Sequence, residues 1–192
     1  MRKLIAGMKV SLDGKYEGPE SVADWVEAWS DDYGLMAEVD ACVLGAGMYG
    51  GYERYWTSVQ TAPDTPAWIS GAPPTPAERQ WADFIRRTPH YVLSATLDHA
   101  DWPDTAFIRG VADLAALKQQ AGKSIYLVGG GRTTAGLIDA GVVDELRLIV
   151  YPVIAGDGKA LFATGGRRQG LDLRRAEPLG DGRVRLAYGI GG

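Results

Sequence analysis

The residues best suited to bind a ligand surround three consecutive glycines, Gly129, Gly130 and Gly131. An apolar run over residues 125–128 precedes them, and a helical pattern begins at Thr133. Glycines at such a turn let the backbone approach a ligand closely and adopt conformations that other residues avoid. The new helix begins with unpaired N–H groups and a partial positive charge, which favour a phosphate. The pattern therefore indicates a phosphate or pyrophosphate site at a strand-to-helix turn.

This turn lacks the standard nucleotide-binding fingerprints. Thr134 replaces the third glycine of G-x-G-x-x-G, and no acidic residue follows at the spacing that would hold a ribose. No lysine followed by serine or threonine comes after the three glycines to make a P-loop. Arg132, Thr133 and Thr134 still add hydrogen-bond donors. A tight strand-to-helix turn without any ligand is the alternative explanation.

The histidines and the cysteine indicate no metal site. Cys42 lies in the apolar run 41–44 and is expected to be a buried hydrophobic residue rather than a nucleophile. His90 begins an expected strand, and His99 lies in an acidic loop. Two histidines so placed, with one buried cysteine, make no ligand set.

The composition favours one folded domain over residues 1–192. The formal net charge is −4, and no Lys/Arg-rich run is present, which argues against nucleic-acid binding. No run of about 18 apolar residues is present to span a membrane. The N-terminus has too few apolar residues for a signal peptide. We therefore expect a cytoplasmic protein.

Short apolar runs alternate with amphipathic stretches, which is typical of α/β layer folds. The expected strands cover residues 4–12, 40–45, 90–96, 105–109, 124–128 and 144–153. The expected helices cover residues 21–36, a segment after Thr75, 113–121 and 133–140. Asp181-Gly182 predicts an antiparallel hairpin between residues 171–177 and 183–188. Residues 46–74 show no sustained period and are expected to form a long loop. Trp56 and Trp68 within it are candidates to line a substrate cleft.

Several segments resemble one family in chain order. These are V-S-L-D-G-K at 10–15, L-G-A-G-M-Y at 44–49, L-S-A-T at 93–96, G-G-G at 129–131, D-E-L at 144–146 and G-D-G-K-A-L-F at 156–162. The set is similar to the dihydrofolate reductase-like superfamily and, within it, to the reductase domain of riboflavin biosynthesis. The resemblance implies a three-layer α/β fold with a mixed, mostly parallel sheet and a C-terminal antiparallel hairpin.

The resemblance also implies an NADPH-dependent oxidoreductase that acts on a small heterocyclic or ribosylamino-pyrimidine-like substrate. Ala6 would lie against the nicotinamide, and Ser94, Ala95 and Thr96 would face the adenosine end. The pyrophosphate would be held from two sides by Gly45, Ala46, Gly47, Met48, Val128, Gly129, Gly130, Gly131, Arg132, Thr133 and Thr134. In this family the Gly129-Gly130 bond would be cis.

One departure concerns the phosphate contacts. The family usually has arginine at the position of Ala46 and threonine at that of Met48. Losing a guanidinium removes a bidentate phosphate ligand, for which Arg54 or Arg132 would have to compensate. A preference for NADPH over NADH is therefore a hypothesis.

The catalytic candidates rest on the same resemblance. Asp24 would be the carboxylate of the first helix, with a pKa raised by burial beside Trp25, or only the capping partner of Ser21. Asp13 would contact polar substrate groups or simply shape its turn. Lys15 would bind a substrate phosphate or remain solvated.

Two other functions stay open. One is dihydrofolate reductase activity. The other is a non-catalytic, nucleotide-binding dimeric module, which the missing arginine at position 46 favours. Relatives of this kind often form homodimers, and the apolar strand at 146–153 would be a candidate for that contact. No Cys/His zinc motif is present to make a deaminase domain.

Overall fold

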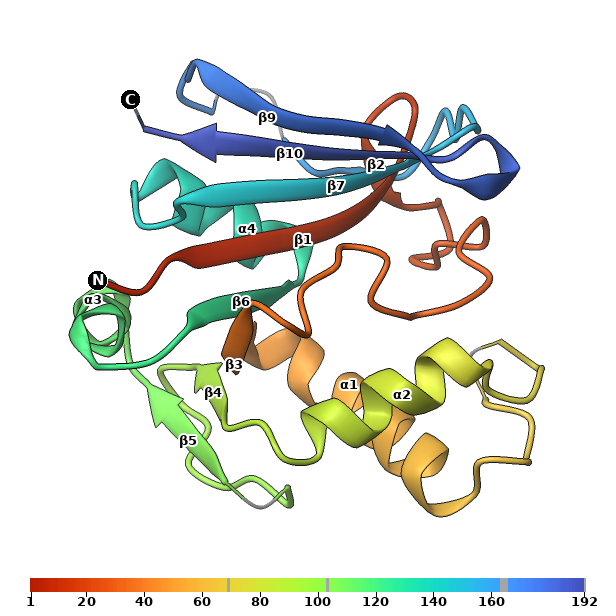
Figure 1. Cartoon of the computed structure of the whole chain (residues 1–192), viewed down its shortest axis with the longest axis horizontal. Coiled ribbons are helices and arrows are strands. Elements are labelled where there is room, and N and C mark those ends of the chain that lie inside the picture. Colours follow the sequence, from red (N-terminus) through yellow and green to blue (C-terminus); the bar gives the residue numbers. More distant parts are fainter. Residues whose placement is uncertain (69, 103, 163–165, 192) are drawn as a thin grey trace.

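The computed structural model describes residues 1–68, 70–102, 104–162 and 166–191. Its main sheet has eight strands in the order β5-β4-β3-β6-β1-β7-β10-β9 (Figure 1). They are β1 (Leu4–Ser11), β3 (Val39–Gly45), β4 (His90–Leu93), β5 (Thr105–Ile108), β6 (Ser124–Gly129), β7 (Glu145–Tyr151), β9 (Leu171–Pro178) and β10 (Val184–Ile190). The pairs from β5 to β7 are parallel, whereas β10 runs antiparallel to both β7 and β9.

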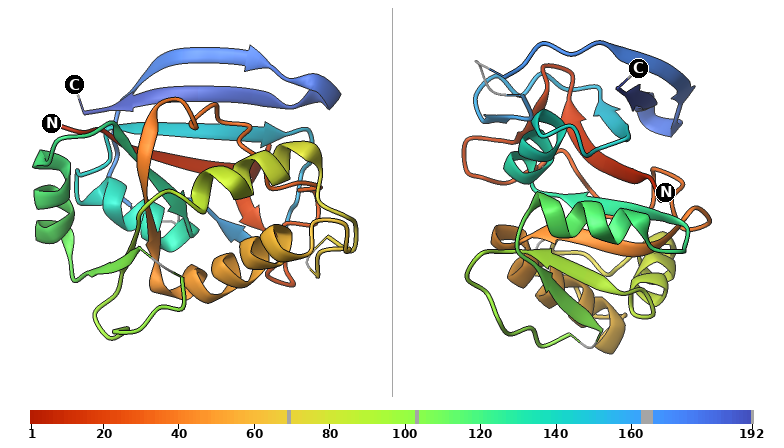
Figure 2. Two further views of the ribbon diagram at one scale, coloured as in Figure 1. Left: turned by 60° about the horizontal axis from the view of Figure 1, so that its bottom comes forward. Right: turned by 90° about the vertical axis from the view of Figure 1, so that its left-hand side faces the viewer.

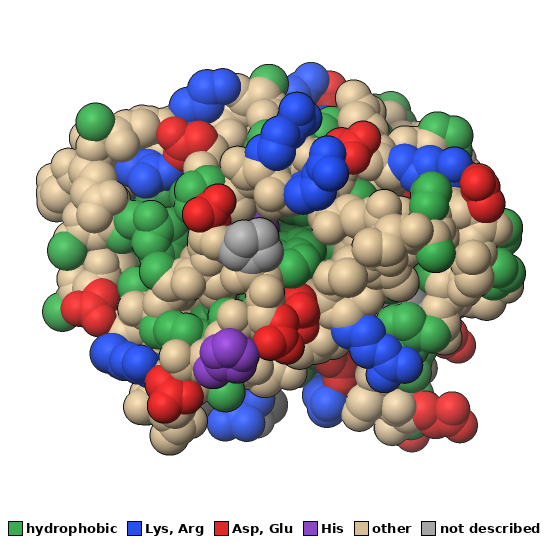
Figure 3. Space-filling model, turned by 90° about the horizontal axis from the view of Figure 1, so that it is seen from below, with side chains coloured by type: hydrophobic (Ala, Val, Ile, Leu, Met, Phe, Trp, Pro, Cys, Tyr) green, Lys and Arg blue, Asp and Glu red, His purple; other side chains and the backbone are tan. Residues whose placement is uncertain are grey.

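A second sheet pairs β2 (Lys15–Glu17) with β8 (Lys159–Ala160). The β9–β10 hairpin forms the edge of the main sheet farthest from α1 and α2 (Figure 2). Seen from below, acidic and basic side chains are interspersed (Figure 3). No helix among the described residues is long and apolar enough to cross a membrane.

Helices cover both faces of the sheet. Residues of α1 (Ala46–Thr61) and α2 (Pro76–Ile85) share one apolar core with Ile5 and Ile149. Residues of α3 (Val111–Gln119) and α4 (Gly131–Asp139) share the other with Leu4 and Leu146. Successive side chains of a strand point to opposite faces, so the buried strands are apolar on both sides. The expected three-layer fold with its C-terminal hairpin is confirmed.

The start of α2 follows the sequence signal closely. Thr75 accepts a hydrogen bond from the Glu78 backbone N–H, and the Glu78 carboxylate accepts one from the Thr75 N–H. This reciprocal pair is a capping box, whose T-x-x-E spacing is visible in the sequence. Local chemistry alone therefore fixes where this helix begins.

The helix expected over residues 21–36 is wrong, because this segment is irregular. Short turns bond some of its carbonyl groups, and side chains from the sheet bond two others. Lys9 donates to the Ala28 oxygen at 2.6 Å, and Arg147 donates to the Tyr33 oxygen at 3.0 Å. Trp25, Trp29 and Tyr33 of this segment nevertheless pack on the α1–α2 core.

The long loop expected over residues 46–74 is also wrong in its first half, where α1 forms. Five aromatic and aliphatic side chains of α1 are buried: Tyr49, Tyr52, Tyr55, Trp56 and Val59. Glycines weaken a helix, and Gly47, Gly50 and Gly51 concealed its pattern in the sequence. Packing of this face against the sheet and α2 outweighs that weak propensity.

Candidate functional site

The two glycine-containing turns lie at a switch point of the sheet. Strands β3 and β6 are parallel neighbours, and Leu44 is paired with Gly129. After β3 the chain enters α1 on one face of the sheet, whereas after β6 it enters α4 on the other. Ligands of open α/β sheets bind where such connections diverge, outside the carboxyl ends of the strands.

The two turns touch each other at this point. A Cβ added to Gly45 would overlap the hydroxyl oxygen of Thr133. A Cβ added to Gly130 would lie 3.7 Å from that same oxygen and 4.0 Å from the Met48 Cβ. The structure therefore brings together two predicted segments, 45–48 and 129–134, that lie far apart in the sequence.

The N-termini of α1 and α4 have free hydrogen-bonding capacity. Neither helix has a side-chain cap, whereas α2 has a full capping box. The first N–H groups of an uncapped helix lack intrahelical partners, and the helix dipole adds partial positive charge there. Two such ends beside one glycine turn fit a diphosphate, as in a dinucleotide cofactor.

The glycine turn reaches its shape without a cis bond. No peptide bond is cis among the described residues, so the expected cis Gly129-Gly130 bond is wrong. Instead Gly129 and Gly130 adopt φ angles of 116° and 84°, which residues other than glycine rarely adopt. These two left-handed residues turn the chain from β6 into α4.

Gly131 is required for a different reason. A Cβ added there would overlap the ring of Tyr16, which is half-buried on β2. The same ring packs against a small core of Met8, Val10 and Leu161. Tyr16 thus lies beside the first turn of α4, which sequence reasoning missed. Its position directly after the S-L-D-G-K segment was the only available signal.

Residues 94–96 lie at the same edge of the sheet. Leu93, at the end of β4, is paired with Gly45. The buried Ser94 hydroxyl accepts from the N–H groups of Thr96 at 3.2 Å and Leu97 at 2.9 Å, so it stabilises its own turn. Ala95 and Thr96 are exposed.

Ala6 is fully buried in the core shared with α3 and α4. Its side chain therefore reaches no surface. The neighbour that meets the glycine turn is Met8, whose sulfur would lie 3.0 Å from a Cβ on Gly129. Any contact between a cofactor and Ala6 would have to use the backbone.

Neither proposed acid lies in a setting suited to proton donation. Asp24 is exposed and outside any helix, so the burial expected beside Trp25 is absent. Asp13 is also exposed and accepts hydrogen bonds from Ser11 at 2.6 Å and from the N–H groups of Ala155 and Gly156 at 2.9 Å. The Ser11 bond and the two backbone bonds lower the pKa of Asp13 to about 2. Asp13 is therefore an ionised clamp between two loops.

The two substrate candidates differ in position. Lys15 is half-buried on β2, with its Nζ 3.5 Å from the Gly158 oxygen. Trp56 is only 3% exposed and packs against Tyr52 and Tyr55, so the expectation that it lines a cleft is wrong. Trp68 is exposed and stacks with Arg54, whose Cζ lies 4.7 Å from the ring centre. Among the described residues, no group of three His, Cys, Asp or Glu side chains could hold a metal ion.

A charged cluster that the sequence did not predict lies near the ends of β1 and β7. Lys9 is buried and donates to Asp32 at 2.7 Å. Arg183 donates to the same carboxylate at 3.3 Å and to the Tyr151 hydroxyl at 3.5 Å. Burial lowers the pKa of Lys9, while Asp32 opposes that shift. A lysine within an otherwise apolar strand was the signal that could have revealed this cluster.

Comparisons with known proteins agree with this architecture. The family model described as the RibD C-terminal domain matches residues 2–184. The uncharacterized protein YyaP of Bacillus subtilis (strain 168) is 28% identical over 192 residues, covering 97% of this chain and 94% of that protein.

Two solved structures share the fold. A putative riboflavin biosynthesis protein from Shewanella sp. PV-4 superposes with a TM-score of 0.71 at 18% identity, covering 99% of each chain. Dihydrofolate reductase from Enterococcus faecalis, complexed with NADP(H) and RAB-propyl, superposes with a TM-score of 0.62 at 11% identity. That match covers 99% of this chain and 97% of the reductase.

Proposed function

This chain belongs to the RibD C-terminal domain family, and from that membership we propose that it is an NADPH-dependent reductase of a small heterocyclic or ribosylamino-pyrimidine-like substrate. The fold shared with a riboflavin biosynthesis protein and with an NADP(H)-bound dihydrofolate reductase supports the reaction class. The observation that carries the proposal is the meeting of two uncapped helix N-termini beside Gly45 and Gly130.

The proposal gives each part of the site a task. NADPH, when bound, supplies the hydride. The first turns of α1 and α4 bind its diphosphate, and Gly129 and Gly130 let the backbone approach it. Residues 94–96 lie where the adenosine end would extend. Tyr16 closes one side of the α4 N-terminus and limits access of water there.

Few basic side chains near the site can contact the extra phosphate that distinguishes NADPH from NADH. Ala46 begins α1 without a guanidinium, and Arg54 is stacked on Trp68. Arg132 is exposed in the first turn of α4, and we assign it the remaining phosphate contact. Dissociation constants for NADPH and NADH test this preference, and equal values would rule it out. Ala46→Arg should tighten NADPH binding several-fold by restoring a bidentate ligand.

Titration of the intrinsic tryptophan fluorescence with NADPH tests the proposed function. We expect saturable binding on the order of micromolar. Gly130→Val should weaken it at least tenfold, because valine is strained at a φ of 84°. Gly136→Ala is the matched control, since a Cβ at this glycine of α4 meets nothing within 4 Å. Absence of binding by the folded wild-type protein would reject the proposal.

The second candidate is a nucleotide-binding module without turnover, which the alanine at position 46 favours. It would bind NADPH, yet oxidise none of it with any heterocycle in a screen. Dihydrofolate belongs in that screen, and inhibition by methotrexate would identify dihydrofolate reductase activity.

The proposal includes a homodimer, but not through the edge of the strand expected at 146–153, because β7 is paired with β1 and with β10. Leu171 and Leu173 are 41% and 57% exposed on the edge strand β9, and apolar side chains on a sheet edge favour pairing with another chain. Light scattering after size-exclusion chromatography measures the mass. Leu173→Lys should shift a dimer of wild-type protein towards the monomer, and a monomeric wild type would reject this part.

A further inference from the structure

A cavity of about 320 Å³ lies apart from the glycine turns, between the irregular segment 25–32, the end of β7 and the β9–β10 hairpin. The red-to-orange segment that contains residues 25–32 and the blue turn between β9 and β10 both lie at the right of Figure 1. Its walls include Trp25, Glu27, Asp32, Tyr151, Asp181 and Arg183. Ligand pockets begin at roughly 300 Å³, so this volume suits one small ring system.

The cavity opens at the same edge of the sheet as the glycine turns. Strand β1 lies between β6 and β7, with Met8 beside Gly129 and Ser11 paired with Tyr151. Three residues of extended strand separate Met8 from Ser11, a rise of about 10 Å. A hydride donor anchored at α4 and an acceptor in the cavity would therefore lie along the same stretch of β1.

The walls combine aromatic and charged groups. Trp25 and Tyr151 supply ring surfaces, and the Arg183 guanidinium lies 5.4 Å from the Tyr151 ring centre. Arg183 is already bonded to acids, through its Nε to Asp181 at 2.7 Å and through its Nη1 to Asp32 at 3.3 Å. The positive charge of Arg183 is thus largely neutralised by these two carboxylates and attracts a ligand anion only weakly.

The balance of charge around the cavity is negative. Glu27, Asp32 and Asp181 line it, against Arg183 alone. Lys9, which is not a cavity wall, also pairs with Asp32 and offsets its negative charge. The carboxylates still outnumber the basic groups. Carboxylates accept hydrogen bonds and repel anions, so these walls favour a ligand that donates N–H groups.

We propose that this cavity binds the hydride acceptor, and that the acceptor is a planar, amino-bearing ring that is neutral or cationic rather than phosphorylated or carboxylated. This inference rests on the proposed reductase function. It places the acceptor away from Lys15, whose Nζ is at the β2–β8 sheet and not among the cavity walls. Trp25 and Tyr151 enclose the ring, and Asp181 and Glu27 accept its N–H groups.

Three isosteric probes test the charge preference: benzamidine, benzamide and benzoate, which are cationic, neutral and anionic. Their dissociation constants are measured by ligand-observed NMR with saturating NADP⁺, so that the cofactor site is not available to them. We expect benzamidine and benzamide to bind at least tenfold more tightly than benzoate. Equal or tighter binding of benzoate, or no binding of any probe, would overturn the proposal.

Two variants locate the binding. Asp181→Asn should weaken benzamidine several-fold and narrow its advantage over benzoate, and asparagine tolerates the φ of 63° at this position. Asp172→Asn is the matched control, because Asp172 is also an exposed carboxylate paired with an arginine of the same hairpin, outside the cavity. Trp25→Leu should weaken all binding probes, whereas Trp68→Leu should not. Identical effects of the paired variants would place the probes elsewhere.

The NADPH titration separates this inference from the proposed function. If NADPH binds but the cavity variants leave the dissociation constants of the probes unchanged, the reductase proposal stands and the acceptor assignment fails. If NADPH does not bind but the probes, measured without NADP⁺, follow the expected pattern, the cavity is a binding site and the reductase proposal fails.

Discussion

The hydroxyl oxygen of Thr133 lies directly against the Cα of Gly45, so that no side chain fits at the end of β3. Thr133 belongs to α4 and Gly45 precedes α1, which cover opposite faces of the sheet. The contact therefore sets how closely the two helix N-termini approach each other. In the proposed function this spacing must match one diphosphate.

Gly45→Ala should weaken NADPH binding at least tenfold, because the added methyl group would push the start of α4 away from β3. Removing the obstructing hydroxyl with Thr133→Ala should recover much of the lost affinity. The recovery is not complete, because the Cβ of residue 133 would remain 3.3 Å from the new methyl group. Dissociation constants of the wild type, both single variants and the double variant measure the coupling. Strictly additive effects would contradict it.

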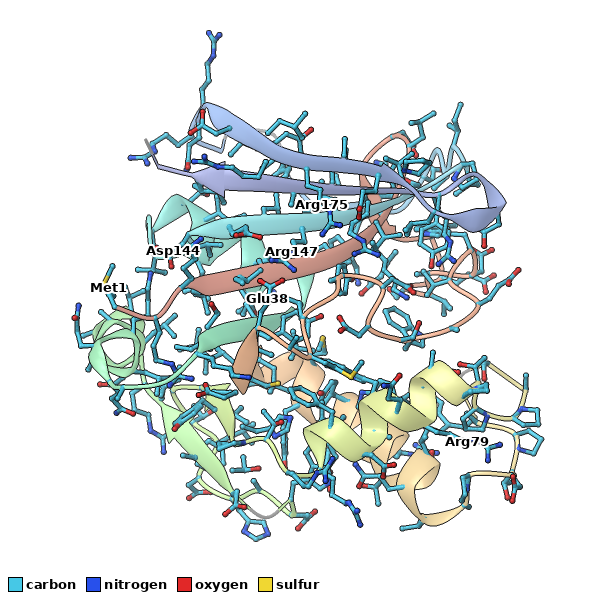
Figure 4. All side chains as sticks on the ribbon, viewed as in Figure 1. Met1, Glu38, Arg79, Asp144, Arg147 and Arg175 are labelled. Carbon is cyan, nitrogen blue, oxygen red and sulfur yellow. The ribbon has the colours of Figure 1, made fainter. Side chains whose placement is uncertain are left out.

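Arg147→Met should lower the free energy of unfolding by about 3 kcal/mol, because it leaves the buried Tyr33 carbonyl and the half-buried Glu145 carboxylate without this partner. Arg147 bonds Glu38 at 2.7 and 3.1 Å, Glu145 at 2.7 Å and the Tyr33 oxygen at 3.0 Å. Arg147 and Glu38 point toward one another (Figure 4). Urea unfolding measures the change. Arg175→Met, on the exposed side of the sheet, should cost less than about 0.5 kcal/mol; equal losses would contradict this account.

His90 should make the protein sensitive to acid. Its side chain is 1% exposed beside the rings of Tyr52 and Trp102, and burial lowers its pKa from 6.5 to about 4. His90 therefore becomes protonated below pH 6.5 in the unfolded chain, but only near pH 4 in the folded chain. Stability is full above pH 6.5 and falls by up to about 3 kcal/mol as the pH drops through that range.

His90→Phe keeps an aromatic ring in the same place and should flatten the loss of stability between pH 6.5 and 4. His99→Asn is the control, because His99 is exposed and should leave the profile unchanged. Urea midpoints at several pH values make the comparison. A His90→Phe profile as steep as that of the wild type would assign the acid sensitivity to other groups.

Asp13→Asn should loosen residues 154–158 without unfolding the protein. The variant loses a charged acceptor for the N–H groups of Ala155 and Gly156. Hydrogen exchange at these two amides should accelerate several-fold, while that of the β1 and β7 amides stays unchanged. Asp24→Asn should have no effect, because Asp24 is exposed. Unchanged exchange at Ala155 and Gly156 in Asp13→Asn would show that the clamp is unimportant.

Local chemistry allowed much of the fold to be predicted. The buried strands are continuous apolar runs, and the capping box at Thr75 and the Asp181-Gly182 turn act within a few residues. The helix expected from residue 21 failed, because Lys9 and Arg147 capture carbonyl groups of that segment. The prediction of a loop was wrong over its first half, because α1 is stabilised by packing against the sheet and α2. No local sequence pattern reveals that packing.

The candidate site divides in the same way. The sequence by itself predicted the family and, through that resemblance, the segment at 94–96. It predicted the turns at 45–48 and 129–134 also because backbone constraints select glycine directly. Only the tertiary structure decided that Thr133 meets Gly45, that Tyr16 covers Gly131, and that Trp56 is buried. It also decided that Asp13 is a clamp and that Asp32, Tyr151 and Arg183 surround one cavity. Such contacts join residues from distant parts of the sequence, and their energies depend on burial and on partners that only the folded chain brings together.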